Sequence, residues 1–378
     1  MTATFGRILA GMRIASRLPR PTSPGSGAVR VTRSRLSARW SRLFAVAVVA
    51  VMAYMPYATD PGTTAVLINF LILLTMAAMW NLLAGYAGLI SVGQQAFVGL
   101  GAYTVLVLAQ NGLSPFAAIP LAAIVCGVLA LPISWLVFRL RGGYFAIATW
   151  VVADVLELVI SRVPQLGGGT GAALPGLFDI DPAWITAYTY WAALLVAVAA
   201  LGMMYLVLRS RVGLALTAIR DNEVGASSVG VRVGRTKRIV YTLSAAGTGA
   251  AGALVAVSQL NVQAASVFNV HWSAYMIFVV IIGGFGSIEG AILGAIVFFS
   301  LQQALSQYGA WYLIVLGTIA IVIALWQPRG LWGAISGRLH FSFFNTGYWL
   351  WPRTDAGEPE ATPADAGGTG AAIAAESK

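Results

Sequence analysis

Two acidic side chains inside an apolar run are the first residues that could take part in chemistry. Asp154 and Glu157 lie within residues 144–161, and their i, i+3 spacing places them on one face of a helix. A carboxylate in a membrane span is costly and is typical of an interior pathway or of contact with a partner. The alternative is a position near the outer interface. Asp154 lies about 15 Å and Glu157 about 20 Å along a helix from Tyr144, which favours sites within the membrane, in a solute pathway or a subunit interface.

A second polar group interrupts the apolar residues 81–104, NLLAGYAGLISVGQQAFVGLGAYT. Glycine weakens a helix by about 1 kcal/mol relative to alanine, and a buried glutamine side chain needs hydrogen-bond partners. Because Gly93 directly precedes Gln94 and Gln95, we predict a broken or kinked helix that lines a solute pathway together with Asn81. The competing interpretation is close helix packing, with both amides bonded to neighbouring helices.

Catalytic and metal-binding constellations are absent from the sequence. His271 and His340 are isolated, the single Cys126 lies in an apolar run, and no Ser-His-Asp arrangement or pair of catalytic carboxylates emerges. The phosphate-binding pattern G-x-x-x-x-G-K-[ST] is also missing. We therefore expect a chain that is not an enzyme and that binds no metal, no ATP and no other cofactor.

The composition predicts an all-α polytopic membrane protein. Of the 378 residues, 58% are hydrophobic and 10% are charged, whereas soluble domains carry about 25% charged residues. A span needs about 20 residues, and about ten hydrophobic segments fit the chain: 43–58, 65–84, 89–109, 116–138, 144–161, 190–208, 239–260, 273–287, 290–308 and 312–326.

The eighth of these segments is short and ends in a glycine-rich run. Gly283, Gly284, Gly286 and Ser287 predict a break or turn there, because such a run does not sustain a helix. Segments eight and nine then form either two spans or a re-entrant pair. We therefore expect eight to ten crossings.

The basic residues predict which side of the membrane each loop faces. If the segments alternate from a cytoplasmic N-terminus, all but one of the 23 Lys and Arg residues face the cytoplasm, the exception being Arg162. Both termini are therefore expected to be cytoplasmic. The same distribution beside the spans indicates contact with membrane lipid, and it argues against nucleic acid as a partner despite the net charge of +10.

Composition also divides the chain into three regions. Residues 1–42 contain nine arginines and no acidic residue, and they are predicted to form a basic, disordered cytoplasmic leader. Residues 43–333 form the transmembrane domain. Residues 334–378 form a cytoplasmic tail that is predicted to be disordered from about residue 354, where Ala, Gly, Glu and Pro predominate.

The longest cytoplasmic loop, residues 209–238, reads RSRVGLALTAIRDNEVGASSVGVRVGRTKR. It predicts a short helix over residues 214–229 with one polar face, ended by Gly230 in a left-handed conformation. Such a helix suits the docking of a soluble partner, and an amphipathic helix at the membrane surface is the alternative. The candidate docking residues are Gly213, Ala218, Ile219, Arg220, Asp221, Asn222, Glu223 and Gly230.

The order of residues in this loop resembles the coupling segment of ABC importer permeases. SRVGLALTAIRDNEVGASSVGV resembles in particular the branched-chain amino-acid permease family of the LivM type. Further stretches resemble the same family in the same order: GYAGLISVGQQAFVGLGAYT at 85–104, RLRGGYFAIATW at 139–150, LGGGTGAALPG at 166–176, SAAGTGAAGAL at 244–254, IGGFGSIEGAILGA at 282–295 and QPRGLWG at 327–333. Together the blocks span residues 81–333.

The resemblance implies a membrane subunit of an ATP-driven importer in the bacterial inner membrane. Such permeases pair with a second permease, as a heterodimer, and with two cytoplasmic ATPases that use ATP and Mg²⁺. An extracytoplasmic binding protein delivers the solute, which is expected to be a branched-chain or other amino acid, or a related carboxylate or amide. The alternative is a stand-alone secondary transporter or channel, for which Asp154 and Glu157 are the available internal sites.

Overall fold

The computed structural model describes residues 29–32, 37–177, 181–309, 311–327, 330–339 and 349–352. These residues belong to two separate units. The larger unit holds the described residues from 37 to 339, and the smaller one is the antiparallel pair of β1 (Val29–Thr32) and β4 (Trp349–Pro352). The predicted disorder falls largely outside the described residues, since 1–28, 33–36 and everything after 352 are not among them.

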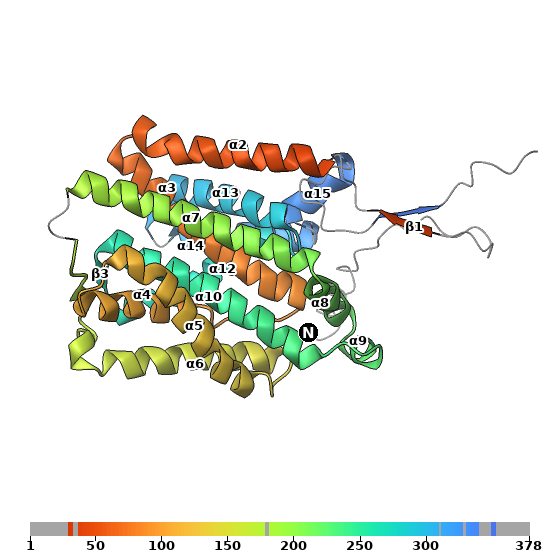
Figure 1. Ribbon diagram of the computed structural model, residues 1–378, viewed down its shortest axis with the longest axis horizontal. Helices are drawn as coiled ribbons and strands as arrows, with labels where there is room; N and C mark the ends of the chain where they lie inside the picture. The colour runs from red at the N-terminus through yellow and green to blue at the C-terminus, as the bar shows by residue number, and fades with distance from the viewer. Residues whose placement is uncertain are drawn as a thin grey trace, which may run out of the picture. The chain divides into compact units, whose positions relative to one another are not determined.

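The larger unit confirms the predicted helical membrane class (Figure 1). Its helices are α2 (Ser37–Ala58), α3 (Pro61–Asn81) continued by the π-helix η1 (Leu82–Tyr86), α4 (Gln95–Gln110), α5 (Pro115–Val137), α6 (Gly143–Ser161), α7 (Pro182–Arg209), α8 (Arg211–Asp221), α9 (Glu223–Ser228), α10 (Val233–Gln259), α11 (Ala264–Val267), α12 (His271–Gly283), α13 (Ile288–Leu305), α14 (Trp311–Trp326) and α15 (Gly330–Leu339). Shorter elements are the 3-10 turns η2 (Pro164–Leu166) and η3 (Ser306–Tyr308), and the antiparallel pair β2 (Ala172–Ala173) and β3 (Asn261–Val262).

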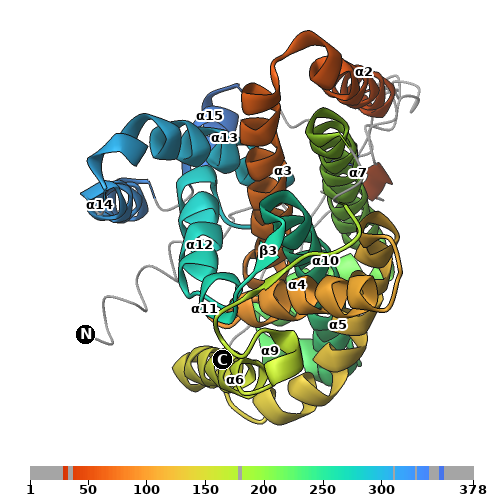
Figure 2. The same ribbon diagram turned by 90° about the vertical axis from the view of Figure 1, so that its left-hand side faces the viewer.

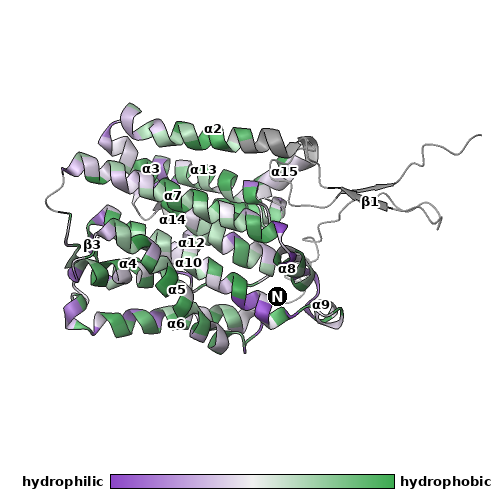
Figure 3. Ribbon diagram, in the orientation of Figure 1, coloured by the Kyte–Doolittle hydropathy of each residue, from purple (hydrophilic) through white to green (hydrophobic). Residues whose placement is uncertain are grey.

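The predicted count of about ten crossings is not confirmed. Every one of the ten predicted apolar segments overlaps a helix, but among the described residues only seven helical stretches are long and apolar enough to cross a membrane. An eighth results if the bent pair α14 and α15 counts as one span, while α2 and α4 contribute shorter apolar stretches. Figure 3 shows hydrophobic residues along the long helices and hydrophilic ones gathered around α8 and the start of α10.

Three of the long helices begin with the same local signal, a capping side chain followed by proline. Asp60, Ser114 and Asp181 each accept a hydrogen bond from a backbone N–H of the first turn of α3, α5 and α7. Proline fits the next position because it has no N–H to leave unpaired there. Hydrogen bonds from the Thr63 hydroxyl and backbone also lower the pKa of Asp60 below its ordinary value.

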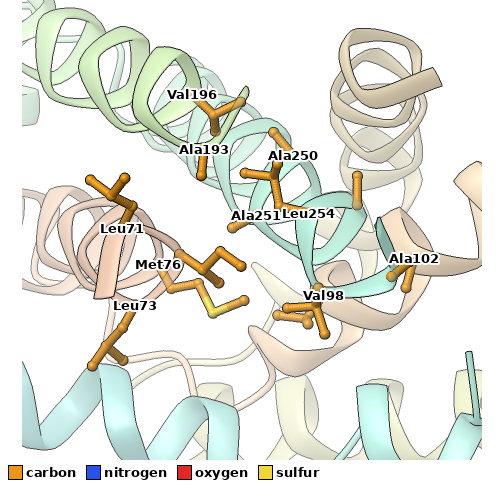
Figure 4. Close-up of a cluster of buried hydrophobic side chains, with 14 of the residues drawn as sticks. Leu71, Leu73, Met76, Val98, Ala102, Ala193, Val196, Ala250, Ala251 and Leu254 are labelled. Atoms are coloured by element: carbon orange, nitrogen blue, oxygen red, sulfur yellow. The ribbon is translucent and has the colours of Figure 1, made fainter. Parts of the chain in front are cut away.

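The core is built around α10, which packs against α3, α4, α5 and α7. Its small residues 244–254 allow this close approach. A Cβ on Gly101 of α4 would overlap the carbonyl of Gly249 in α10, so the two backbones touch. Figure 4 shows apolar side chains of α3, α4, α7 and α10 meeting in one cluster, among them Met76, Val98 and Leu254.

Three predicted boundaries require correction. α7 begins at residue 182, not 190, because the Asp181–Pro182 cap starts it early and shortens the loop before it. The third segment was predicted as one run over 89–109, but its helix begins only at Gln95. The single helix predicted over 214–229 is two helices, since Asn222 is extended (φ −157°, ψ 106°) and caps α9.

Candidate functional site

Two breaks in the helices lie at glycine-rich runs. The first comprises residues 88–94, between η1 and α4, and the second comprises residues 284–287, between α12 and α13. Gly88, Gly284 and Gly286 have φ values of 69°, 128° and 70°, a region that glycine enters readily and other residues avoid. Both runs are outside the regular helices, and the positive φ values at these three positions favour glycine.

The buried side chain of Asn81 joins the end of α3 to the second break. Its Nδ2 donates to the Ser287 carbonyl at 2.8 Å, and its Oδ1 accepts from the Gly286 backbone N–H at 3.0 Å. A Cβ on Gly85 would overlap the Asn81 amide and would lie 2.6 Å from the Gly286 nitrogen. Asn81, Gly85, Gly286 and Ser287 thus form one compact contact, which we call the break junction.

Arg220 connects the break junction to the surface helix α8. Its Nη1 donates to the Gly85 carbonyl at 3.0 Å, and a Cβ on Gly286 would lie 3.0 Å from the same nitrogen. A Cβ on Gly88 would lie 3.5 Å from the Arg220 Cγ, so the aliphatic part of the arginine covers the first break. Arg220 of α8 therefore lies against residues of both breaks.

The side chains of the predicted polar cluster, residues 220–223, point in several directions. Besides Arg220, Asn222 caps α9 by accepting from the Gly225 N–H at 2.9 Å, and Glu223 pairs with Lys237 at 2.7 Å. Asp221 is exposed and meets the Arg220 Nε at 3.4 Å, a geometry that contributes little to stability. The four residues are therefore not one polar face.

The apolar residues of α8 and α9 also divide into two sets. Gly213 and Ile219 are buried against the membrane helices, with Ala218 half-buried beside them. Val224 and Val229 are instead 75% and 77% exposed, and Gly230 ends the segment in the predicted left-handed conformation with φ 87°. An exposed apolar surface on a capped pair of short helices is suited to binding a partner.

Gln94 and Gln95 are fully buried and point to different helices. The Gln94 Nε2 donates to the Ser244 hydroxyl of α10 at 3.5 Å, and the Ser273 hydroxyl of α12 donates to the Gln95 Oε1. Neither Gln94 Oε1 nor Gln95 Nε2 has a hydrogen-bond partner among the described residues. Each amide therefore has one polar atom with a hydrogen-bond partner and one without. The bonded atom fits the packing interpretation, and the unbonded atom fits the pathway interpretation.

Gly93 brings the first break against α6. A Cβ at this position would overlap the carbonyl oxygen of Thr149, and the Val92 N–H donates to the Thr149 hydroxyl at 3.2 Å. The contact is possible only because residue 93 has no side chain. Gly93 therefore has a packing role, whatever it contributes to a pathway.

Asp154 and Glu157 have different surroundings although both lie on α6. Glu157 is half-buried, whereas its neighbour Asp154 is exposed and lies further from the buried stripe of α6. Asp154 therefore does not face the interior of this chain. Of the two expectations for it, contact with a partner fits its position better than an interior cavity.

A comparison with models of known protein families shows the family to which the chain belongs. The model for the permease component of branched-chain amino acid transport systems matches residues 62–324. The chain belongs to this family. It is a multi-pass membrane permease.

Curated relatives agree with this assignment. The permease is 27% identical over 317 residues to the high-affinity branched-chain amino acid transport system permease protein LivM of Escherichia coli strain K12, covering 77% of this chain and 74% of the relative. The fructose import permease protein FruG of Bifidobacterium longum is 26% identical over 276 residues, or 68% and 79% of the two chains. The xylose transport system permease protein XylH of Escherichia coli is 31% identical over 142 residues, or 35% and 36%. No solved structure matches the permease.

No group of three or more His, Cys, Asp and Glu residues that could hold a metal occurs in the described part of the permease. His271 stacks on Tyr275 with ring centroids 6.2 Å apart, and Cys126 is a buried residue beside Gly249. His340 lies outside the described residues. The prediction that the permease binds no metal or cofactor stays a prediction.

Several residues around the breaks of the permease were not predicted from the sequence. Ser244 and Ser273, the partners of the two glutamines, lie in small and apolar runs that carry no polar signal. Glu289 is only 8% exposed at the start of α13, where a helix N-terminus favours an acid. In the sequence, Glu289 closely follows the glycine-rich run, and this position could have indicated an acid at the start of a helix.

Proposed function

We propose that this permease is the membrane-spanning subunit of an ATP-driven importer for a small polar solute, a branched-chain or other amino acid or a related carboxylate or amide. The observation that carries the proposal is the link from the exposed helices α8 and α9, through Arg220, to the break junction inside the membrane domain. A transporter driven from outside its membrane domain needs such a link. Family membership and the named relatives support the same assignment.

The proposal includes an orientation and a set of partners. Both termini are cytoplasmic in a bacterial inner membrane, which the positions of Lys and Arg support. The contact of Arg220 with Gly85, and that of Asn81 with Gly286, bring the basic loop 209–238 close to residues 85–88 and to the turn before residue 288, which supports a common cytoplasmic side for them. The partners are a second permease subunit, two cytoplasmic ATPases that bind ATP and Mg²⁺, and an extracytoplasmic solute-binding protein.

In this mechanism the ATPases move α8, and Arg220 carries the movement to both breaks. Segments without regular helical hydrogen bonds bend more easily than helices, so the breaks are the places where α4 and α13 change direction first. Rearrangement there would switch the access of the solute site from one side of the membrane to the other. The chain itself contributes no covalent chemistry.

Reconstitution distinguishes this function from a stand-alone transporter. Uptake into proteoliposomes is expected to require this chain, the second permease, the ATPases, the binding protein and internal ATP together. Solute uptake by this chain without any ATPase would establish the secondary-transporter alternative instead.

Replacing Val224 with aspartate tests the docking surface. A charge on this 75% exposed apolar residue should lower the ATPase that co-purifies with the chain by about tenfold or more, as for a central interface residue. The control is Leu113→Asp, which places the same charge on an exposed apolar residue beyond the far end of α4. ATPase recovery that falls equally in both variants, or in neither, would contradict docking at α9.

The variant Gln94→Leu separates the pathway from the packing interpretation. It removes a buried oxygen that has no partner, and Ser244 keeps its own bond to the Met79 carbonyl at 2.9 Å, so stability should be unchanged or higher. If the amide serves the solute, uptake is expected to fall about tenfold while the protein yield stays normal. Unchanged uptake with normal folding would assign Gln94 to packing.

A further inference from the structure

Helix α6 packs against the rest of the chain through a narrow stripe of buried residues. Phe145, Thr149 and Ala153 are its buried residues, and they recur at intervals of four. It packs against α4, α5 and α11 at the margin of the unit (Figure 2). Only 17% of its most apolar stretch is buried, the lowest share among the seven candidate spans.

Asp154 lies in the middle of the opposite, outward face. Ile147, Val151 and Leu158 continue this face in both directions at helical spacing and are 58%, 52% and 60% exposed. Asp154 is exposed like them and has no hydrogen bond or ion pair to the described residues. It is the twelfth of the 19 residues of α6, about 17 Å from the helix start, which is near the middle of a bilayer.

Lipid alone does not fit this face, because hydrocarbon offers no partner to a carboxylate at that depth. A second copy of the same chain does not fit either. α6 carries two acidic residues and no basic one, and a two-fold interface brings the same patches together, so Asp154 would face acidic residues. Charge complementarity instead requires a different membrane protein that supplies a donor.

We propose that the outward face of α6 binds the second permease subunit, and that an arginine, lysine or amide donor of that subunit pairs with Asp154 within the membrane. This inference rests on the proposed function, which includes such a subunit. It adds the interface, its central residue and the chemistry of the partner. It also explains why α6, an apolar span, contacts so little of its own chain.

Photo-crosslinking of the complete transporter tests the position of the interface. Benzoylphenylalanine placed at Val151 or Leu158 should form an adduct with the second permease subunit. The matched control is Leu195 of α7, which is 69% exposed on another helix, and it should not form that adduct. Adducts with lipid alone, or between two copies of this chain, would overturn the proposal.

Charge reversal tests the pairing. Asp154→Lys should lower the second permease recovered per molecule of this chain by about tenfold or more, since a donor would then face a like charge. Asp154→Asn keeps an acceptor and should lose less. Leu195→Lys carries the same new charge on α7 and should not reduce recovery.

The outcomes separate this proposal from the function on which it rests. If the wild-type chain co-purifies with no second permease, the proposed function itself fails. If the subunit is recovered with the wild type and Asp154→Lys recovers just as much, or Leu195→Lys recovers as little as Asp154→Lys, only the assignment of the α6 interface is wrong.

Discussion

Replacing Arg220 with glutamine should reduce ATP-driven uptake by about tenfold or more while the ATPase subunits still co-purify with the chain. The expected loss follows from the direction of this side chain, whose Nη1 donates to the Gly85 carbonyl instead of pointing into solvent. Glutamine is too short to span from α8 to the break junction. ATP hydrolysis would then continue without solute movement, so the variant is expected to be uncoupled.

Two controls make this result specific to the link. Arg220→Lys keeps the charge but offers one flexible ammonium instead of a planar guanidinium, and it should retain part of the uptake. Asp221→Asn changes the exposed neighbour, whose side chain is 71% accessible, and uptake should be unchanged. Full uptake in Arg220→Gln would show that coupling does not pass through this residue. Loss of the ATPase on purification would make Arg220 a docking residue instead.

The two glycine-rich runs could be found in the sequence because their effect on the backbone is local. Gly88, Gly284 and Gly286 adopt conformations that depend mainly on the absence of a side chain, so a glycine-rich run in an apolar segment is sufficient warning. The start of α7 could have been found in the same way, since Asp181 followed by Pro182 is a local capping signal. Apolar runs alone did not determine how many helices cross the membrane.

The directions of the polar side chains could not be predicted, because tertiary packing sets them. Arg220, Asp221 and Glu223 are close in sequence, yet one reaches the break junction, one is exposed and one pairs with Lys237. Similarly, the apolar run 144–161 predicted a helix that carries both Asp154 and Glu157, as α6 does. It did not show that Glu157 is half-buried while Asp154 is exposed.

Replacing Gly93 with alanine should destabilise the permease by about 2 kcal/mol, the range found when a side chain is forced into a well-packed interior. The added Cβ would overlap the Thr149 carbonyl oxygen, which belongs to the α6 backbone and moves only if α6 moves. Thermal unfolding of the detergent-solubilised protein measures the effect as a lower midpoint. Residue 93 lies outside a helix and its φ is not positive, so a loss of stability would come from the contact and not from helix propensity or backbone strain.

Gly202→Ala provides the matched comparison, since a Cβ at residue 202 of α7 would meet no atom within 4 Å. That variant should be unchanged or slightly more stable, because alanine favours a helix over glycine by about 1 kcal/mol. Gly93→Ala has a further consequence if α6 carries the subunit interface. Displacement of α6 at Thr149 would shift Asp154, so this variant should also bind the second permease more weakly, whereas Gly202→Ala should not. Equal stability of the two variants would mean that the contact between Gly93 and Thr149 is not close in solution.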